Sequence, residues 1–196
     1  MIRAQLVRSR SDDLSSMQLE TLDAFPVVPG SVRVRLRAAS VNFPDILMIQ
    51  GRYQYKPELP FTPGMEGAGD IVECGNGVSG FSVGDKVVVG TRHGCFSEEI
   101  VVPVSALRPL PRGFSYEQGA AYPAAYLTAY VALVRRGNLQ SGETLLVHGA
   151  AGGVGLAAVD LGKVLGARVI ATASSKEKRA FLKGPIPRSF PGEIRC

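Results

Sequence analysis

The feature that most constrains this chain is a short apolar stretch that runs directly into a cluster of glycines. Residues 144–147 read Thr-Leu-Leu-Val, residues 149–155 read Gly-Ala-Ala-Gly-Gly-Val-Gly, and an apolar pattern of helical period continues to residue 165. A second apolar segment follows at residues 168–172. A strand, a glycine turn, a helix and a second strand in this order predict a dinucleotide site, because glycines let the backbone approach a pyrophosphate at the helix start. The cofactor contacts predicted in this turn are Gly149, Ala150, Gly152, Gly153, Val154 and Gly155.

The first hundred residues are expected to be mainly β. In residues 31–38, aliphatic side chains alternate with Arg33, Arg35 and Arg37, which predicts a strand with its aliphatic face in a core and its arginines in solvent. Residues 17–22, 70–72, 85–89 and 96–102 are further strand candidates. Pro44 can begin a short helix that Gly51 closes. The prolines between residues 57 and 63 predict an extended loop.

A helical region separates this β-rich part from the glycine turn. Ser115 and Gln118 have the spacing of a capping box, in which each side chain meets the other residue's backbone N–H. The Ala-rich run that follows is expected to be helical despite Pro123. Arg135 and Arg136 suit the carbonyls of a helix end, and the following glycine can terminate it. We expect this region to be the passage between two domains.

Composition excludes several classes of protein. A chain of 196 residues can form one large domain or two small ones. The net charge of +5 comes from scattered Lys and Arg without interleaved aromatic residues, so nucleic-acid binding has no support. Three widely spaced cysteines argue against a disulfide-rich secreted domain and against a structural zinc site. Because no signal peptide and no membrane span is recognisable, a cytoplasmic protein without a membrane partner is expected.

Six blocks of sequence carry a resemblance to a known family. They are residues 41–45 (VNFPD), 51–53 (GRY), 63–69 (PGMEGAG), 84–87 (GDKV), 120–130 (AAYP and LTAY) and the glycine turn 149–155. In this order and spacing the chain resembles the medium-chain dehydrogenase/reductases, and within them the zinc-independent quinone oxidoreductase (zeta-crystallin-like) branch. The resemblance implies an α/β fold (α+β overall), with a GroES-like β-barrel substrate domain in residues 1–125. The N-terminal part of a Rossmann NAD(P)-binding domain would then occupy residues 126–183.

The end of the chain departs from this family. A complete Rossmann sheet has about six parallel strands, and the sequence supplies two. Residues 184–196 do not resemble the family, and their three prolines and two glycines leave no strand pattern, so a disordered tail is expected. We expect an incomplete doubly wound parallel sheet, apparently C-terminally truncated through a frameshift or a shortened gene product. Such a sheet has an unpaired edge and uncovered apolar faces, which predicts weak stability and aggregation or dependence on a partner.

The positions at which zinc-dependent relatives hold their metal carry other residues here. Those relatives use a Cys and a Gly-His-Glu motif, whereas this chain has Asn42 in the first region and Met65 at the His position. Neither residue is a good zinc ligand, so no metal is predicted. Glu66 is interpreted as a structural carboxylate at a strand entrance. Asp45 is interpreted as a first-turn residue that complements the helix dipole.

The same resemblance implies three residues of the catalytic cleft. Asn42 and Tyr53 would line the nicotinamide and substrate cleft, and Thr128 would lie near the nicotinamide. Each has an alternative: a turn-stabilising Asn, a packed aromatic ring and a buried helix hydroxyl. His93 and His148 are interpreted as structural, the second because it ends a strand that is expected to be buried.

The cofactor prediction depends on the end of the second Rossmann strand. An NAD site usually has Asp or Glu there for the ribose hydroxyls, but this chain continues Ala-Ser-Ser-Lys-Glu-Lys over residues 173–178. Ser174 and Ser175 offer hydroxyls, and Lys178 or Lys176 offers a cation, for a 2′-phosphate. NADPH is therefore predicted, although these residues could also simply begin a helix.

Two functions remain open at this point. The first is an NADPH-dependent oxidoreductase that transfers a hydride to a quinone or enone, where positioning and hydrogen bonds replace a metal. The second is a truncated, non-catalytic remnant with a binding or structural role. The partner expected for the first is a small-molecule quinone or enone, and full-length relatives often form homodimers through Rossmann edge strands.

Overall fold

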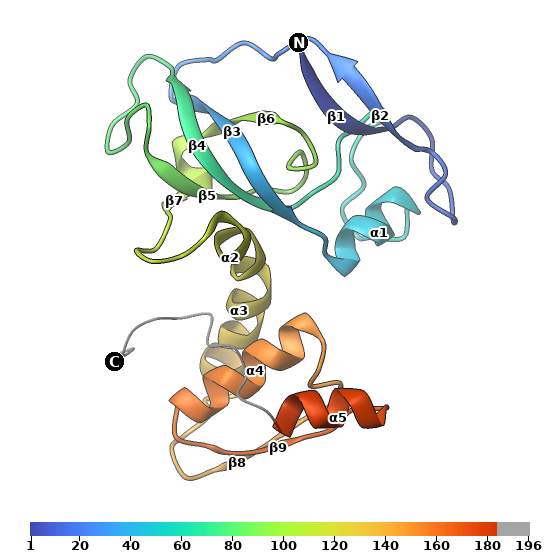
Figure 1. Cartoon of the computed structure of the whole chain (residues 1–196), viewed down its shortest axis with the longest axis vertical. Helices are drawn as coiled ribbons and strands as arrows, with labels where there is room; N and C mark the ends of the chain where they lie inside the picture. Colours follow the sequence, from blue (N-terminus) through green and yellow to red (C-terminus); the bar gives the residue numbers. More distant parts are fainter. Residues whose placement is uncertain (184–196) are drawn as a thin grey trace. The chain divides into compact units, whose positions relative to one another are not determined.

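A computed structural model describes residues 1–183 of the chain, which divides into two compact units (Figure 1). Unit 1 is Met1–Ala121 and unit 2 begins at Tyr122. The division lies close to residue 125, where the family resemblance implies a domain boundary. The tail predicted at residues 184–196 lies outside the described residues.

Unit 1 contains two antiparallel sheets. Strands β1 (Ile2–Val7) and β2 (Met17–Leu22) form a pair, and five further strands form a sheet in the order β6-β3-β4-β5-β7. These five are β3 (Ser31–Ser40), β4 (Glu66–Cys74), β5 (Lys86–Gly90), β6 (Glu99–Pro103) and β7 (Leu107–Pro109). The mainly β prediction is confirmed, although β6 begins at Glu99 rather than at residue 96. Strand β7 was not predicted, because a strand this short shows no recognisable period.

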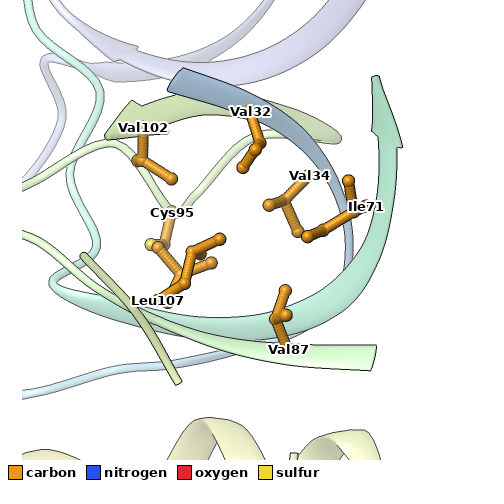
Figure 2. Packing of buried hydrophobic residues seen from close by; sticks show 8 residues of the cluster. Val32, Val34, Ile71, Val87, Cys95, Val102 and Leu107 are labelled. Atoms are coloured by element: carbon orange, nitrogen blue, oxygen red, sulfur yellow. The ribbon is translucent and has the colours of Figure 1, made fainter. Parts of the chain in front are cut away.

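The core of unit 1 lies within the five-stranded sheet (Figure 2). Val32 and Val34 of β3 are fully buried, as the alternation predicts, and Arg35 and Arg37 are exposed. Arg33 corrects the prediction of a solvated arginine row, since its side chain is only 13% exposed. It is covered because it lies between Glu73 and Glu99, with N···O distances of 2.9 and 3.8 Å.

A short helix and the proline-rich loop form a second apolar cluster in unit 1. Helix α1 (Phe43–Ile49) contributes Met48 and Ile49, which pack with Val7 of β1 and Phe61 of the loop. The predicted start at Pro44 is confirmed within one residue, and the chain turns after α1 at Gly51, whose φ of +71° suits glycine.

The helical passage is broken where Pro123 stands. Helix α2 (Tyr116–Ala121) begins with the predicted capping box: the Gln118 N–H donates to the Ser115 Oγ (3.2 Å), and the Ser115 N–H donates to the Gln118 Oε1 (2.9 Å). Helix α3 (Pro123–Tyr130) starts at the proline itself, and a π-helical turn, Val131–Arg136, follows it to Gly137. The expected single helix is therefore two helices, because a proline lacks the N–H that a helix interior needs.

Unit 2 contains two parallel strands, β8 (Thr144–Val147) and β9 (Arg168–Ala171), joined by α4 (Gly153–Val164) and followed by α5 (Lys176–Lys183) (Figure 1). Helix α4 packs on α3 through a cluster that includes Ala129, Ala157 and Leu161. Within residues 122–183 the parallel sheet has no third strand, as expected. Leu146 and Ile170, which pair in register, are 52% and 42% exposed, so the prediction of uncovered apolar faces is confirmed.

His148 does not end a buried strand, so the reason given for its structural role is wrong. Two of the four residues of β8 are exposed and only Val147 is buried, and His148 itself is exposed. Its Nδ1 lies 3.1 Å from the Thr172 Oγ1, which links the ends of β8 and β9. In the part of the chain that the structure describes, no helix is both long and apolar enough to cross a membrane.

Candidate functional site

The glycine turn of unit 2 leaves β8 through a left-handed residue. Gly149 has a φ of +61°, a backbone conformation that residues other than glycine rarely adopt. The Ala150 N–H then donates to the Thr172 carbonyl (2.9 Å), which ties the turn to the end of β9, and Ala150 is fully buried. Gly152 is the N-cap of α4, and its N–H donates to the Gly149 carbonyl (3.0 Å).

At Gly155, the first turn of α4 packs closely against the backbone of Gly149 and Ala150, which follow β8. A Cβ there would lie 2.5 Å from the Gly149 carbonyl oxygen and 2.8 Å from the Ala150 Cα. Both neighbours are backbone atoms that cannot move aside. Only glycine therefore allows this close approach of helix and turn, which is the packing role that the last glycine of a dinucleotide motif has.

The N-terminus of α4 carries backbone donors that its own helix does not use. The first helical hydrogen bond runs from the Leu156 N–H to the Gly152 carbonyl (2.8 Å). The N–H groups of Gly153, Val154 and Gly155 therefore have no intrahelical acceptor. A Cβ at Gly153 would meet nothing within 4 Å, and Val154 is 46% exposed. Free N–H groups beside open space at the positive end of a helix fit a pyrophosphate.

A second polar patch follows β9, at the same carboxyl edge of the two-stranded sheet. The Ser175 Oγ accepts the Lys178 N–H (3.2 Å), so Ser175 begins α5 and the helix-start alternative is correct for this side chain. The backbone N–H of Glu177 itself, and after it the Ser175 hydroxyl, lower the pKa of the Glu177 carboxyl. Ser174 and Lys178 are exposed.

One cation of this patch was missed from the sequence. The Arg179 Nη1 donates to the carbonyls of Ala173 (3.0 Å) and Ser174 (3.3 Å), which fixes the guanidinium beside the predicted 2′-phosphate position. Its signal in the sequence is its place in the first turn of α5, one turn beyond the two serines.

Asn42 in unit 1 is held by contacts around the start of α1. Its backbone N–H donates to the Asp45 Oδ2 (2.8 Å), and its Nδ2 donates to the Glu66 Oε1 (2.8 Å). A longer contact of 3.4 Å joins the same Nδ2 to the Ser40 Oγ. These bonds support the turn-stabilising interpretation, and the role in the cleft stays a prediction.

Two carboxyl groups are buried beside Asn42. Asp45 is 1% exposed and also accepts the Gly64 N–H (3.1 Å), so it does more than complement a helix dipole. Burial raises its pKa. Glu66, at 2% exposed, is the first residue of β4, where the sequence placed a structural carboxylate. Burial and the negative charges of Asp45 and Glu66 raise the pKa of Cys95 to about 12.

Tyr53 borders a hollow of about 350 Å³ in unit 1, which is also lined by Gln54, Tyr55, Met65 and Arg92. Tyr53 and Met65 pack against the apolar cluster of Val7, Met48, Ile49 and Phe61. The side chain at the zinc-ligand position is therefore part of an apolar cluster. Within residues 1–183, no three His, Cys, Asp or Glu side chains are grouped so that they could hold a metal ion.

Thr128 lies in unit 2 and is exposed on α3, so the alternative of a buried helix hydroxyl is wrong. It lines an open groove with Leu127, Val131, Ala132 and Arg136. Sites on unit 1 and unit 2 are thus defined separately: the structure groups Asn42 with Asp45 and Glu66, Tyr53 with Met65, and the glycine turn with the serine patch. His93 stacks on Tyr55 and meets Phe61 edge-on, as a structural residue would.

The chain is similar to a known domain family and to longer proteins. Residues 28–112 match the alcohol dehydrogenase GroES-like domain. The human synaptic vesicle membrane protein VAT-1 homolog is 43% identical over 173 residues, which are 87% of this chain and 44% of that protein. The quinone oxidoreductase-like protein 2 homolog of Nematostella vectensis is 49% identical over 154 residues, or 78% of this chain and 42% of the relative.

A solved structure extends the likeness to both units. The quinone oxidoreductase from Thermus thermophilus, described with its NADPH complex, has a TM-score of 0.79 and 36% identity, and the match covers 90% of this chain and 55% of that one. The GroES-like strands, the βαβ glycine turn and these relatives define one class: the chain belongs to the medium-chain dehydrogenase/reductase family. It spans about half the length of the relatives that it matches.

Proposed function

We propose that this chain provides the substrate domain and the cofactor turn of an NADPH-dependent oxidoreductase that reduces a quinone or an enone without a metal. The observation that carries the proposal is the edge of the parallel sheet in unit 2. There, the unused N–H groups of Gly153, Val154 and Gly155 and the side chains of Ser174 and Lys178 follow strands whose ends are joined by the Ala150–Thr172 hydrogen bond.

The residues present fit a phosphorylated dinucleotide. The start of α4 would hold the pyrophosphate through backbone N–H groups, and Ser174, Lys178 and Arg179 would hold a 2′-phosphate. No carboxylate stands at the end of β9, where it would repel that phosphate: residues 172–175 are Thr, Ala, Ser and Ser. The bound nicotinamide would supply a hydride to the acceptor.

The acceptor class follows from the chemistry of unit 1. A thioether at residue 65 and an amide at residue 42 cannot polarise an isolated carbonyl as a zinc ion does. A conjugated acceptor spreads the incoming charge, and a hydrogen bond from the phenol of Tyr53 would then suffice to orient it and stabilise that charge. Quinones and enones are such acceptors.

Cofactor binding is tested by calorimetric titration of the purified chain with NADPH and with NADH. Gly153→Asp places a carboxylate at a helix start that tolerates it, because the site is open and the dipole favours an anion. We expect this variant to keep its fold and to lose NADPH binding. Gly90→Asp is the matched control, since a Cβ there also meets nothing within 4 Å. Equal affinity of both variants would contradict the assignment of the turn.

The choice of NADPH is tested with Lys178→Gln. Removing one charge-assisted contact of this kind costs about 1.5–3 kcal/mol, so NADPH affinity should fall at least about tenfold while NADH affinity stays unchanged. Lys183→Gln, at the other end of α5, is the control. A chain that binds the two cofactors equally would overturn the prediction of NADPH.

Activity is tested by following NADPH oxidation with a panel of small quinones and enones. Turnover above the buffer control supports the oxidoreductase. A folded chain that binds cofactor but shows no turnover would favour the alternative, a non-catalytic remnant. The incomplete sheet of unit 2 supports this alternative.

We also propose that the protein acts in the cytoplasm without nucleic-acid or membrane partners, which cell fractionation would test. The homodimer of full-length relatives is tested for this chain by sedimentation.

A further inference from the structure

The hollow beside Tyr53 has a charged group at its border. Its five lining residues offer two phenols (Tyr53 and Tyr55), an amide (Gln54), a thioether (Met65) and one guanidinium, that of Arg92. Among residues 1–183, no acidic side chain lines this hollow. A small ligand bound in the hollow would contact the aromatic and apolar side chains with one of its ends and the positive charge with its other end.

Arg92 is positioned by an aromatic ring rather than by a carboxylate. Its guanidinium carbon lies 5.0 Å from the centroid of the Tyr55 ring, within the range of a cation–π contact. Tyr55 in turn stacks on His93, with ring centroids 6.1 Å apart and planes inclined by 14°. His93 meets Phe61 edge-on, and Phe61 is 4% exposed within the second apolar cluster. A chain of three rings thus anchors the exposed arginine to the core of unit 1.

The other arginines of unit 1 show why this arrangement is informative. Six of them form ion pairs with carboxylates: Arg3, Arg8, Arg33, Arg35, Arg37 and Arg52. Among the residues that the structure describes, four arginines of unit 1 form no such pair: Arg10, Arg92, Arg108 and Arg112. Arg10 and Arg108 donate to backbone carbonyls instead, and Arg92 is the one of the four that lines the hollow. Its donors remain available to an anion, and a guanidinium binds a carboxylate through two parallel hydrogen bonds.

We propose that Arg92 is a substrate-binding residue that selects acceptors carrying a carboxylate. The acceptor class is then a conjugated enone or quinone with a carboxylate at the end remote from the reduced bond. The conjugated part lies against Tyr53, Tyr55 and Met65, and the carboxylate meets the guanidinium. This assignment rests on the proposed function, under which the hollow in unit 1 binds the acceptor substrate.

The test uses two probes that share the same enone and differ at one group, the charged carboxylate of 4-carboxybenzylideneacetone and the neutral group, larger by one methyl, of its methyl ester. Their dissociation constants for the full chain are measured by calorimetry, with and without NADPH. We expect the carboxylate to bind about tenfold more tightly than the ester, as one charge-assisted contact provides. Arg92→Gln should remove this preference by weakening the carboxylate about tenfold and the ester less than twofold. Arg92→Lys, which keeps the charge and loses the fork, should retain part of the preference.

Arg112→Gln is the matched control, because this arginine is exposed, lies in unit 1 outside the lining of the hollow and carries the same charge. Equal loss in Arg112→Gln and Arg92→Gln, equal loss of both probes in Arg92→Gln, or no binding of either probe overturns the proposal. A carboxylate preference lost only in Arg92→Gln, in a chain that reduces neither probe, supports the assignment of Arg92 and counts against the proposed function. Reduction of both probes with the same KM in wild type and Arg92→Gln supports the proposed function and overturns the assignment of Arg92.

Discussion

Two isoleucines, each within a β-strand, show how differently the two units bury their sheets. Ile71 in β4 of unit 1 is 1% exposed, and Ile170 in β9 of unit 2 is 42% exposed. The first strand has a neighbour on each side, β3 and β5, and a core against its apolar face. Within the described residues 1–183, the second strand pairs with β8 alone, and its apolar face is partly uncovered. Unit 1 therefore gains far more from the hydrophobic effect for each strand residue that it orders.

The difference has a consequence for function. In unit 1, Asn42 is positioned by partly buried hydrogen bonds, such as that from its Nδ2 to the Oε1 of the buried Glu66. In unit 2 the glycine turn is positioned by α4 and by backbone hydrogen bonds, such as that from the Ala150 N–H to the Thr172 carbonyl. We therefore expect the glycine turn to lie in the less stable of the two units, and the following predictions test that ordering.

The largest effect is expected for the reactivity of Cys95 in unit 1. Its thiol has a pKa of about 12 instead of 9.0, because it is buried and lies near the charges of Asp45 and Glu66. The pKa is raised, so at pH 8 the folded protein holds the thiol protonated, and the thiolate is about a thousandfold scarcer than in the unfolded chain. We expect iodoacetamide to leave Cys95 unlabelled until unit 1 unfolds, while Cys74, which is only partly buried, reacts earlier.

This labelling separates the two units in a urea titration. Mass spectrometry of Cys95 follows unit 1 alone, whereas far-UV circular dichroism follows both units. If unit 2 is less stable, the dichroism signal should begin to fall at lower urea than the urea at which Cys95 becomes labelled. A single coincident transition would show that the two units unfold together and would break the comparison.

The next effect concerns the two isoleucines themselves. Ile71→Ala removes buried methyl groups and leaves a cavity, which costs about 2–5 kcal/mol of unfolding free energy. Ile170→Ala removes methyl groups that are already partly hydrated, and we expect a cost of about 1 kcal/mol or less. Urea unfolding monitored at Cys95 and by circular dichroism measures both. A cost for Ile170→Ala as large as that for Ile71→Ala would mean that β9 is covered in solution.

Local features of the sequence predicted much of this fold. The alternation around Val32 and Val34, the Ser115–Gln118 capping box and the turn at Gly149 each depend on residues within a few positions of one another. For this reason they were predicted correctly. The effect of Pro123 is also local, but a proline in a helical stretch can either kink one helix or begin a new one. In the structure Pro123 begins a new helix, α3.

The features that the sequence did not predict depend on residues far apart in the chain. Arg33 is covered by Glu73 and Glu99, which lie 40 and 66 positions away and reach it through strand pairing. His148 is exposed because β8 pairs with β9 alone among the described residues, and strand pairing cannot be read from residues 144–148 themselves. In the site, the glycine turn could be predicted from its spacing. The contact of Arg92 with Tyr55 could not, since it joins two loops that lie far apart in the sequence.

Helix starts provide a smaller and more local comparison between the units. Asn42→Ala removes the bond to the buried Glu66 carboxylate as well as a preferred N-cap residue, and we expect a loss of about 1–2 kcal/mol. Ser175→Ala removes one bond to the Lys178 N–H at the exposed start of α5, for which about 0.5–1 kcal/mol is expected. Thermal unfolding of each variant against wild type measures the difference. Asn42→Ser, which can still cap, should recover part of the loss.

The smallest change in stability, and the clearest difference in behaviour, is expected from two exposed leucines. Leu19 in β2 is 60% exposed and Leu146 in β8 is 52% exposed, but Leu146 lies in register with the exposed Ile170 and so forms part of an apolar patch. Threonine suits a strand, so Leu→Thr at either position should change the unfolding free energy by about 0.5 kcal/mol or less. Leu146→Thr should nevertheless reduce light scattering of the concentrated protein, whereas Leu19→Thr should not, because isolated exposed leucines are ordinary and contiguous ones promote association. Equal scattering of the two variants and wild type would show that the open face of unit 2 does not drive self-association, and its low coverage would then affect stability alone.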